Sequence, residues 1–186
     1  MSDIHVYYEA TPNPQTLKFY TAQTIARETA NITNAAEAAR SPLAQKIMGF
    51  PWAAGVFIGS NFVTVTKQEW VDWDIIAEPL SELIKEHLTR GEAVLIEGMG
   101  APAPIEDDPN DSATVKTIKQ ILRDEIRPAV AMDGGDITFD RYENGRVFLQ
   151  MQGSCSGCPS SALTLKEGIE TRLKSAIPEI VEVVAV

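Results

Sequence analysis

The sequence is poor in the side chains that most often bind metals, with only two cysteines and two histidines in 186 residues. The cysteines, Cys155 and Cys158, are three positions apart. A small secreted domain held together by disulfides would need more cysteines than this. A single C-x-x-C pair instead indicates metal binding or redox chemistry.

Lysine and arginine are also scarce, because 16 of them stand against 26 aspartates and glutamates, for a formal net charge of −10. Nucleic-acid binding depends on Lys and Arg side chains that neutralise phosphates. Anionic membrane surfaces attract the same side chains. The sequence shows no basic patch, so we expect neither nucleic acid nor a membrane surface among the partners.

Long apolar runs and targeting signals are missing from the sequence as well. No run approaches the roughly 20 apolar residues that a membrane-spanning helix needs. Residues 1–6 have neither the basic start and apolar core of a secretory signal nor the Arg- and Ser-rich composition of a transit peptide. We therefore expect a cytoplasmic bacterial protein, or a mitochondrial matrix protein whose presequence is missing.

The composition is that of a soluble globular protein, with 44% hydrophobic and 23% charged residues. One stretch, residues 98–111, is rich in Pro, Gly and acidic side chains, and such sequence stays extended and solvated. We predict two small α+β domains joined by a flexible acidic Pro/Gly linker. The predicted boundaries are a first domain at 1–94, the linker at 95–112 and a second domain at 113–186.

The N-terminal segment mixes strand and helix signals. Ser41 is a good N-cap and Pro42 suits the first helical position. Apolar residues after residue 72 recur at helical spacing. The expected elements are strands at 4–9, 16–20, 55–58 and 62–66 and helices at 42–48 and 72–90. Residues 21–40 are ambiguous between loop and helix.

The C-terminal segment predicts the order helix, strand, strand, helix, strand. Asn144-Gly145 is a strong hairpin signal between the first two strands. Pro128 is expected to end the first helix, and two helices on one face of a three-stranded sheet would form a compact α+β unit. The expected elements are a helix from 115 that ends at Pro128, strands at 137–142 and 147–152, a helix at 159–176 and a strand at 180–186. The last strand is almost wholly apolar, which predicts a central or doubly covered position.

Cys155 and Cys158 lie between the end of a predicted strand and the start of a predicted helix. A helix N-terminus favours anions, so this position favours thiolate over thiol, and thiolate is the form that binds soft metals. Gly153 and Gly157 have no side chains, which lets the backbone approach a bulky inorganic group closely. The pair therefore predicts a metal-ligating loop. The nearby carboxylates of Asp133 and Asp136 have no His or nucleophile beside them, so we expect them to shape a local turn, with Asp136 capping or hydrogen-bonding locally. A role in steering partners or tuning the site is the alternative.

Counting ligands leads to a prediction about assembly. An iron–sulfur cubane or a tetrahedral zinc site commonly takes four protein ligands, and this loop offers two. The other candidate ligands, His5 and His87, lie in the other predicted domain. A second copy of the chain would supply the missing two thiolates. We therefore expect a homodimer with the metal group between its subunits, exposed enough to leave easily.

Three other interpretations of the same two cysteines stay open at this point. They could be buried core residues, although a Gly-rich loop disfavours this. They could form a thioredoxin-like dithiol, but the 28 residues after Cys158 are too few to complete a thioredoxin sheet. They could also hold zinc in a metal-stabilised interaction module.

Longer motifs resemble a known family, the Nfu-type NifU-like proteins of iron–sulfur cluster assembly. The C-terminal part resembles their NifU C-terminal domain through Arg127-Pro128, Asp133-Gly-Gly-Asp136, Gly153-Ser-Cys-Ser-Gly-Cys-Pro-Ser-Ser161 and Thr164-Leu-Lys-Glu-Gly-Ile-Glu170. The N-terminal part resembles the Nfu N-terminal domain through Thr11-Pro-Asn-Pro14, Leu17-Lys-Phe19, Ser41-Pro-Leu-Ala44 and Phe62-Val-Thr-Val-Thr-Lys67. The resemblance covers nearly the whole chain.

The resemblance implies a scaffold or carrier, not an enzyme. It implies a [4Fe–4S] cluster, or in an alternative form a [2Fe–2S] cluster, ligated by Cys155 and Cys158 between two protomers. Delivery to apo-proteins would follow, after receipt of the cluster from a donor scaffold. No catalytic residue is expected, and the N-terminal domain is expected to recognise clients or donors. Long NifU proteins carry further cysteine-bearing domains, so we expect this chain to receive and deliver preformed clusters.

Overall fold

A computed structural model describes residues 4–100, 105–155 and 159–186, with side chains described again from residue 162. The chain divides into two compact units, Met1–Pro102 and Ala103–Val186. Each unit combines helices with one sheet, which confirms the predicted α+β class. Across the described residues, no helix has the length and apolar character needed to cross a membrane.

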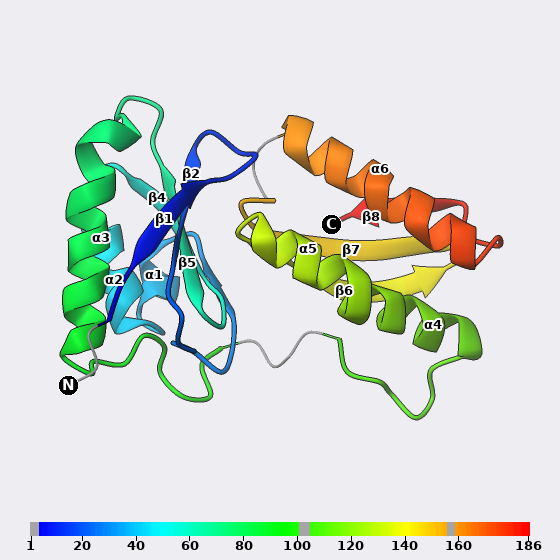
Figure 1. Cartoon of the computed structure of the whole chain (residues 1–186). Helices are drawn as coiled ribbons and strands as arrows, with labels where there is room; N and C mark the ends of the chain where they lie inside the picture. The colour runs from blue at the N-terminus through cyan, green and yellow to red at the C-terminus, as the bar shows by residue number, and fades with distance from the viewer. Residues whose placement is uncertain (1–3, 101–104, 156–158) are drawn as a thin grey trace. The chain divides into compact units, whose positions relative to one another are not determined.

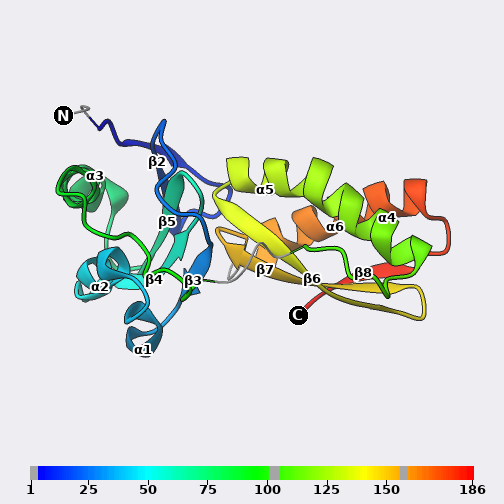
Figure 2. The ribbon, with the colours of Figure 1, turned by 90° about the horizontal axis from the view of Figure 1, so that it is seen from below.

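The N-terminal unit is a five-stranded antiparallel sheet with helices on one face (Figures 1 and 2). The strand order is β1-β2-β5-β4-β3. Its elements are β1 (Tyr7–Ala10), β2 (Thr16–Tyr20), β3 (Ala30–Ile32), α1 (Ala35–Ala38), α2 (Pro42–Met48), β4 (Ala53–Ile58), β5 (Phe62–Lys67) and α3 (Trp73–Thr89).

Local signals explain most of these elements. The hydroxyl of Ser41 accepts a hydrogen bond from the N–H of Ala44, so the predicted cap of α2 is confirmed. Helix α3 runs from Trp73 to Thr89 and continues through Pro79. The ambiguous residues 21–40 contain the short strand β3 and the single-turn helix α1. Strand β1 begins later than predicted, at Tyr7.

The C-terminal unit is a three-stranded sheet in the order β6-β7-β8, with its helices on one face (Figures 1 and 2). Strands β6 and β7 are antiparallel, and β7 and β8 are parallel. Its elements are α4 (Ala113–Ile121), a π-helical turn (Leu122–Ile126), α5 (Arg127–Met132), β6 (Gly135–Glu143), β7 (Arg146–Gly153), α6 (Pro159–Ala176) and β8 (Glu182–Ala185).

The hairpin between β6 and β7 forms where the sequence predicted it. Asn144 and Gly145 both have positive φ, at 50° and 79°, as a two-residue type I′ turn requires. The predicted position of the last strand is wrong, however, because β8 lies at the end of the sheet. Apolar residues dominate β8 although only Val183 is fully buried there.

Pro128 does not end the first helix, which corrects a second prediction. The chain widens into a π-helical turn just before the proline, where the N–H of Arg127 donates to the carbonyl of Leu122. In a regular α-helix, proline lacks the N–H and clashes with the carbonyl four residues earlier. The π-helical turn lies immediately before α5, and Pro128 is in the first turn of α5. The helix then continues to Met132.

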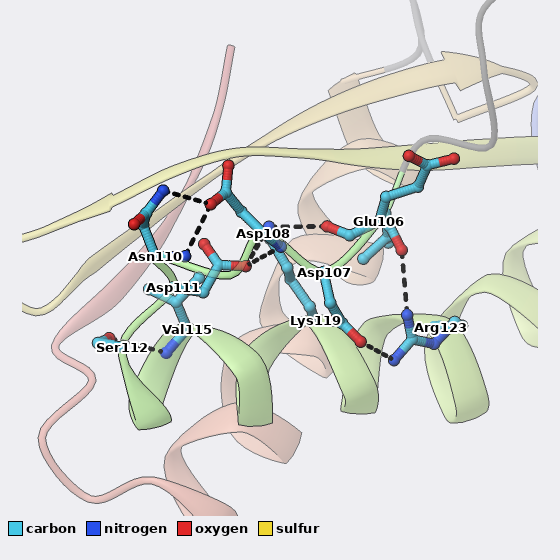
Figure 3. Close-up of polar contacts among 10 residues, drawn as sticks. Glu106, Asp107, Asp108, Asn110, Asp111, Ser112, Val115, Lys119 and Arg123 are labelled. Atoms are coloured by element: carbon cyan, nitrogen blue, oxygen red, sulfur yellow. Dashed lines mark hydrogen bonds and ion pairs between the residues drawn. The ribbon is translucent and has the colours of Figure 1, made fainter.

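The acidic segment before α4 lies against the C-terminal unit (Figure 3). Ile105 is buried in the core of that unit. The ammonium group of Lys119 donates to the Glu106 carbonyl at 2.8 Å and to the Asp111 carboxylate at 2.6 Å. The guanidinium of Arg123 donates to the Ile105 carbonyl at 3.1 Å. Residues 106–110 are exposed, as predicted. The segment is nevertheless held in place by the side chains of Lys119 in α4 and Arg123 in the π-helical turn.

Candidate functional site

Cys155 lies just after the end of β7, in a turn that leads to α6. Only three residues separate it from Pro159, the first residue of that helix. This places Cys155 between strand and helix, as the sequence predicted. Cys158 lies outside the described residues, so the assignment of both cysteines as ligands stays a prediction.

Glycines shape the backbone around Cys155. Gly135 and Gly153 are directly opposite each other at the end of the β6–β7 hairpin. Gly134 and Gly153 have φ values of 80° and 68°, in the left-handed region that favours glycine. A Cβ atom on Gly135 would lie 2.5 Å from the Sγ of Cys155 and 2.8 Å from the carbonyl oxygen of Gln152. The thiol therefore packs directly on the backbone of Gly135.

Hydrogen bonds from Ser154 tie the cysteine turn to the turn that begins β6. The N–H of Ser154 donates to the carbonyl of Gly134 at 3.2 Å, and its hydroxyl donates to the carbonyl of Asp133. The same hydroxyl lies 3.8 Å from the Sγ of Cys155. Two loops that are about twenty residues apart in sequence are thus held together around the thiol.

The thiol of Cys155 is buried and held in its neutral form. Its exposed fraction is 6%. Burial is the main cause that raises the pKa of Cys155 to about 11; the Ser154 hydrogen bond acts in the opposite direction, and the negative charges of Asp133 and Asp136 add to the rise. The sequence predicted a thiolate here, and for Cys155 in the metal-free chain that prediction is wrong, because the loss of water around the sulfur disfavours the charged form.

A buried ion pair lies next to this turn. The carboxylate of Asp136, 5% exposed, accepts two hydrogen bonds from the guanidinium of Arg127, each 2.8 Å long. It also accepts one from the N–H of Ile137 at 2.8 Å. Such a two-point Arg–carboxylate contact is geometrically specific. It fixes the first residues of β6 to the start of α5.

Sequence reasoning predicted only local hydrogen bonding for Asp136, which the Ile137 contact confirms, and did not pair it with Arg127. The one available signal was that both residues fall in motifs of the resembling family. The histidines are not near the cysteine turn in sequence: His87 is buried in α3, and His5 precedes β1. Across the described residues, no three His, Cys, Asp or Glu side chains gather so as to hold a metal ion.

Comparison with known proteins places the chain. Residues 118–184 match the model of the NifU-like domain. Residues 6–91 match the model described as scaffold protein Nfu/NifU N terminal. The chain belongs to the Nfu-type NifU-like proteins. The resemblance seen in the sequence motifs is confirmed.

Several relatives of this family align over most of the chain. NifU-like protein 4, mitochondrial, from Arabidopsis thaliana is 41% identical over 178 residues, which cover 92% of this chain and 62% of the relative. An NFU1 iron-sulfur cluster scaffold homolog, mitochondrial, from Drosophila sechellia is 41% identical and covers 91% of this chain and 60% of the relative. The chain thus spans about three fifths of the length of these relatives.

One solved structure of the family is also similar in sequence. It is the solution NMR structure of a NifU-like protein from Saccharomyces cerevisiae, 31% identical, with a TM-score of 0.45. The match covers 50% of this chain and 86% of that one.

Proposed function

We propose that this NifU-like protein is an iron–sulfur cluster scaffold or carrier that binds a [4Fe–4S] cluster through Cys155 and Cys158. The observation that carries the proposal is the position of Cys155 at a strand–helix junction, seated on Gly135, with a second cysteine three residues later. The relatives named as iron–sulfur cluster scaffolds support the same function. A [2Fe–2S] form is the alternative cargo.

Two thiolates from each of two copies would complete the four ligands that such a cluster takes. The loaded form would therefore be a homodimer, with the cluster at the contact between the subunits. Cluster binding would also release a proton from Cys155, because only the thiolate ligates metal. Loading should consequently become tighter as pH rises toward the pKa of that thiol, which lies at about 11 in the cluster-free chain.

The activity proposed is binding and transfer, not catalysis. A donor scaffold would supply the cluster, and apo forms of iron–sulfur proteins would receive it. Two relatives carry the word mitochondrial in their names, which favours the mitochondrial matrix over the bacterial cytoplasm as the place of action. Recognition of donors and clients is assigned to the N-terminal unit.

A dithiol oxidoreductase is an alternative that would use the same two cysteines. Like cluster binding, it would need Cys155 to lose its proton and become accessible. An attacking thiol needs a lowered pKa and access to its substrate. Burial raises the pKa of the Cys155 thiol to about 11, and the side chain is almost fully buried. A zinc-stabilised interaction module would use the same two ligands, and the experiment below separates it from the cluster carrier.

The test is anaerobic reconstitution of the full chain with iron and sulfide, read by visible absorbance, iron content and sedimentation. Cys155→Ser and Cys158→Ser are the test variants, and Ser60→Ala, in an exposed turn, is the matched control. We expect a cysteine-dependent visible band, about two irons per chain and a dimer. A second step mixes the loaded protein with an apo ferredoxin and follows the recipient's own spectrum.

Three outcomes would contradict the proposal in different ways. A colourless product that folds only with zinc would favour the interaction module. A colourless product with a readily formed disulfide would favour the dithiol enzyme. A coloured protein that sediments as a monomer would retain cluster binding but exclude the shared site.

A further inference from the structure

The N-terminal sheet has one open edge. Strand β1 lies at the end of the strand order, and within the described ranges β2 alone pairs with it. All four residues of β1 are exposed, among them Tyr7 at 53% and Tyr8 at 43%. In an antiparallel pair, alternate residues direct their N–H and C=O groups away from the partner strand. Such a row of unpaired groups is a template for another strand.

The opposite edge of the same sheet is protected. Strand β3 has only three residues, and the guanidinium of Arg40 donates to the carbonyl of Asn31 at 2.9 Å. Short strands and covering side chains are ordinary means of blocking an edge. Strand β1 has no proline, lysine or register shift. Its one charged residue, Glu9, is paired with Lys18 of β2 at 2.9 Å.

A groove of about 420 Å³ runs beside this open edge, between β1 and α3. The hydroxyl of Tyr8 donates to the carboxylate of Glu78 at 3.3 Å across it. Glu82 also lines the groove, one helical turn further along α3. Lys85 is the only Lys or Arg among the described lining residues, and it lies 3.5 Å from Glu82. The groove therefore carries net negative charge beside two exposed aromatic rings.

We propose that β1 and this groove bind an extended, Lys- or Arg-bearing segment of a partner protein. The segment would add to the sheet as a strand along β1, so that backbone hydrogen bonds supply affinity. Its cationic side chains would face Glu78 and Glu82, and arginine would also lie over the faces of Tyr7 or Tyr8. This surface belongs to the N-terminal unit and the cysteine loop to the C-terminal unit, so the proposal does not rest on the cluster function.

The test uses the full chain and three labelled heptapeptides in a fluorescence anisotropy titration. The first peptide alternates valine with lysine or arginine. The second replaces each cationic residue with glutamate. The third keeps the charges but has N-methyl groups on alternate backbone nitrogens, which removes the hydrogen-bond donors. We expect the first peptide to bind at least about tenfold more tightly than either of the others.

Variants locate the binding. Glu78→Gln/Glu82→Gln should weaken binding of the cationic peptide by about fivefold and reduce its salt dependence. Glu143→Gln/Glu167→Gln, in exposed positions of the C-terminal unit, changes the net charge equally and should leave binding unchanged. Tyr7→Lys should weaken binding as well, because it places a cation on the exposed edge. Backbone amide shifts on titration should concentrate in residues 7–10.

Other outcomes would overturn the proposal. Equal binding of the N-methylated peptide would exclude strand addition, and equal binding of the acidic peptide would exclude charge recognition. Amide shifts confined to other elements would place the site elsewhere. A second copy of the chain occupying β1, seen as dimerisation that the cationic peptide does not disrupt, would also contradict a peptide-binding role.

Discussion

Gly135 is the residue whose lack of a side chain the candidate site uses most directly. An alanine there would place its Cβ 2.5 Å from the Sγ of Cys155 and 2.8 Å from a carbonyl oxygen. The cysteine turn would have to move, because the carbonyl oxygen belongs to the backbone of Gln152 and the Cβ of Cys155 also lies close, at 3.3 Å. We expect Gly135→Ala to destabilise the C-terminal unit by about 1–3 kcal/mol and to lower the iron retained after reconstitution.

Gly168 provides the matched control for this substitution. It lies within α6, where a Cβ would meet nothing within 4 Å. Gly168→Ala should raise stability by up to about 1 kcal/mol, because alanine favours the helix, and should leave iron content unchanged. Urea unfolding followed by circular dichroism and an iron assay measure both effects. Equal iron retention by the two variants would show that the Gly135–Cys155 contact is not needed for loading.

The pair between Arg127 and Asp136 leads to a second prediction at this scale. Removing the guanidinium in Arg127→Met would leave a carboxylate that is 5% exposed without its partner. Breaking a buried pair costs about 3–5 kcal/mol, and the lower end applies because the Arg127 side chain is 24% exposed. Denaturant unfolding of the C-terminal unit measures the loss.

Two comparisons make that prediction specific. Arg146→Met removes an exposed ion pair with Glu182 and should cost less than about 1 kcal/mol. The double variant Arg127→Met/Asp136→Asn should recover part of the stability lost in Arg127→Met, because it removes the buried charge. If Arg127→Met unfolds no more easily than Arg146→Met, Asp136 is solvated in solution and the pair does not fix β6 to α5.

At the residue scale, spacing and residue type were enough to single out Cys155 and Cys158. They were not enough to predict the state of the thiol. The burial of Cys155 depends on the turn at Gly134 and Gly135, which lies about twenty residues earlier in the chain. For the same reason, the sequence did not indicate Arg127 as the partner of Asp136. Their contact joins two elements that sequence patterns describe separately.

At the scale of elements, the sequence predicted what local chemistry controls. Helix α2 has the predicted bounds because its cap and its proline are adjacent in sequence. The hairpin of β6 and β7 follows from Asn144-Gly145 in the same way. Two predictions failed because their causes are not local. Passage of the helix through Pro128 depends on a π-helical turn, and the edge position of β8 depends on strand pairing.

The buried His87 of α3 makes the stability of the N-terminal unit depend on pH. Its side chain is fully buried, with Nε2 3.0 Å from the carbonyl oxygen of Ala93. Burial lowers the pKa of His87, and this outweighs the opposite effects of Ala93 and Glu92. The unfolded chain therefore binds a proton more readily than the folded one. Stability should be complete above about pH 6.5, the unfolded pKa, and should fall as pH drops below it.

Tryptophan fluorescence can follow this unit alone, because all three tryptophans lie at or before residue 73. We expect the urea midpoint to fall between about pH 7 and pH 5.5 in the unaltered chain. His87→Gln should show a smaller fall, whereas the exposed His5→Gln should show the full one. A midpoint that rises on acidification, or an undiminished fall in His87→Gln, would contradict the assignment.

At the scale of the whole molecule, strand and helix patterns predicted two α+β units, and composition predicted an acidic segment between them. Composition could not show that parts of this segment pack. Ile105 is 4% exposed and belongs to the core of the C-terminal unit. Lys119 is 8% exposed, and its ammonium group lies 5.4 Å from the ring centroid of Phe139. These contacts join residues from different parts of the sequence. The Pro, Gly and acidic composition of the segment does not indicate them.

These contacts decide where the second domain must begin if it is to be stable alone. A fragment of residues 103–186 keeps Ile105 in its core and keeps the Asp111 carboxylate and Glu106 carbonyl that bind Lys119. A fragment of residues 113–186, the boundary predicted from sequence, loses all three groups. Burying one Ile contributes about 1.5–3 kcal/mol, and Lys119 would be left without its hydrogen-bond acceptors. We therefore expect the shorter fragment to be less stable by about 3 kcal/mol or more.

Urea unfolding of the two fragments, followed by circular dichroism, measures this difference. Within the longer fragment, Ile105→Ala should lower the free energy of unfolding by about 2 kcal/mol or more, which is part of the difference between the two fragments. Asp107→Asn should cost less than about 1 kcal/mol, because that carboxylate is half exposed and lies 3.5 Å from Arg123. If both fragments unfold at the same urea concentration, residues 105–111 are solvated in solution and the boundary at residue 113 stands. If only the longer fragment is stable and binds a cluster, the acidic segment belongs to the folded C-terminal domain.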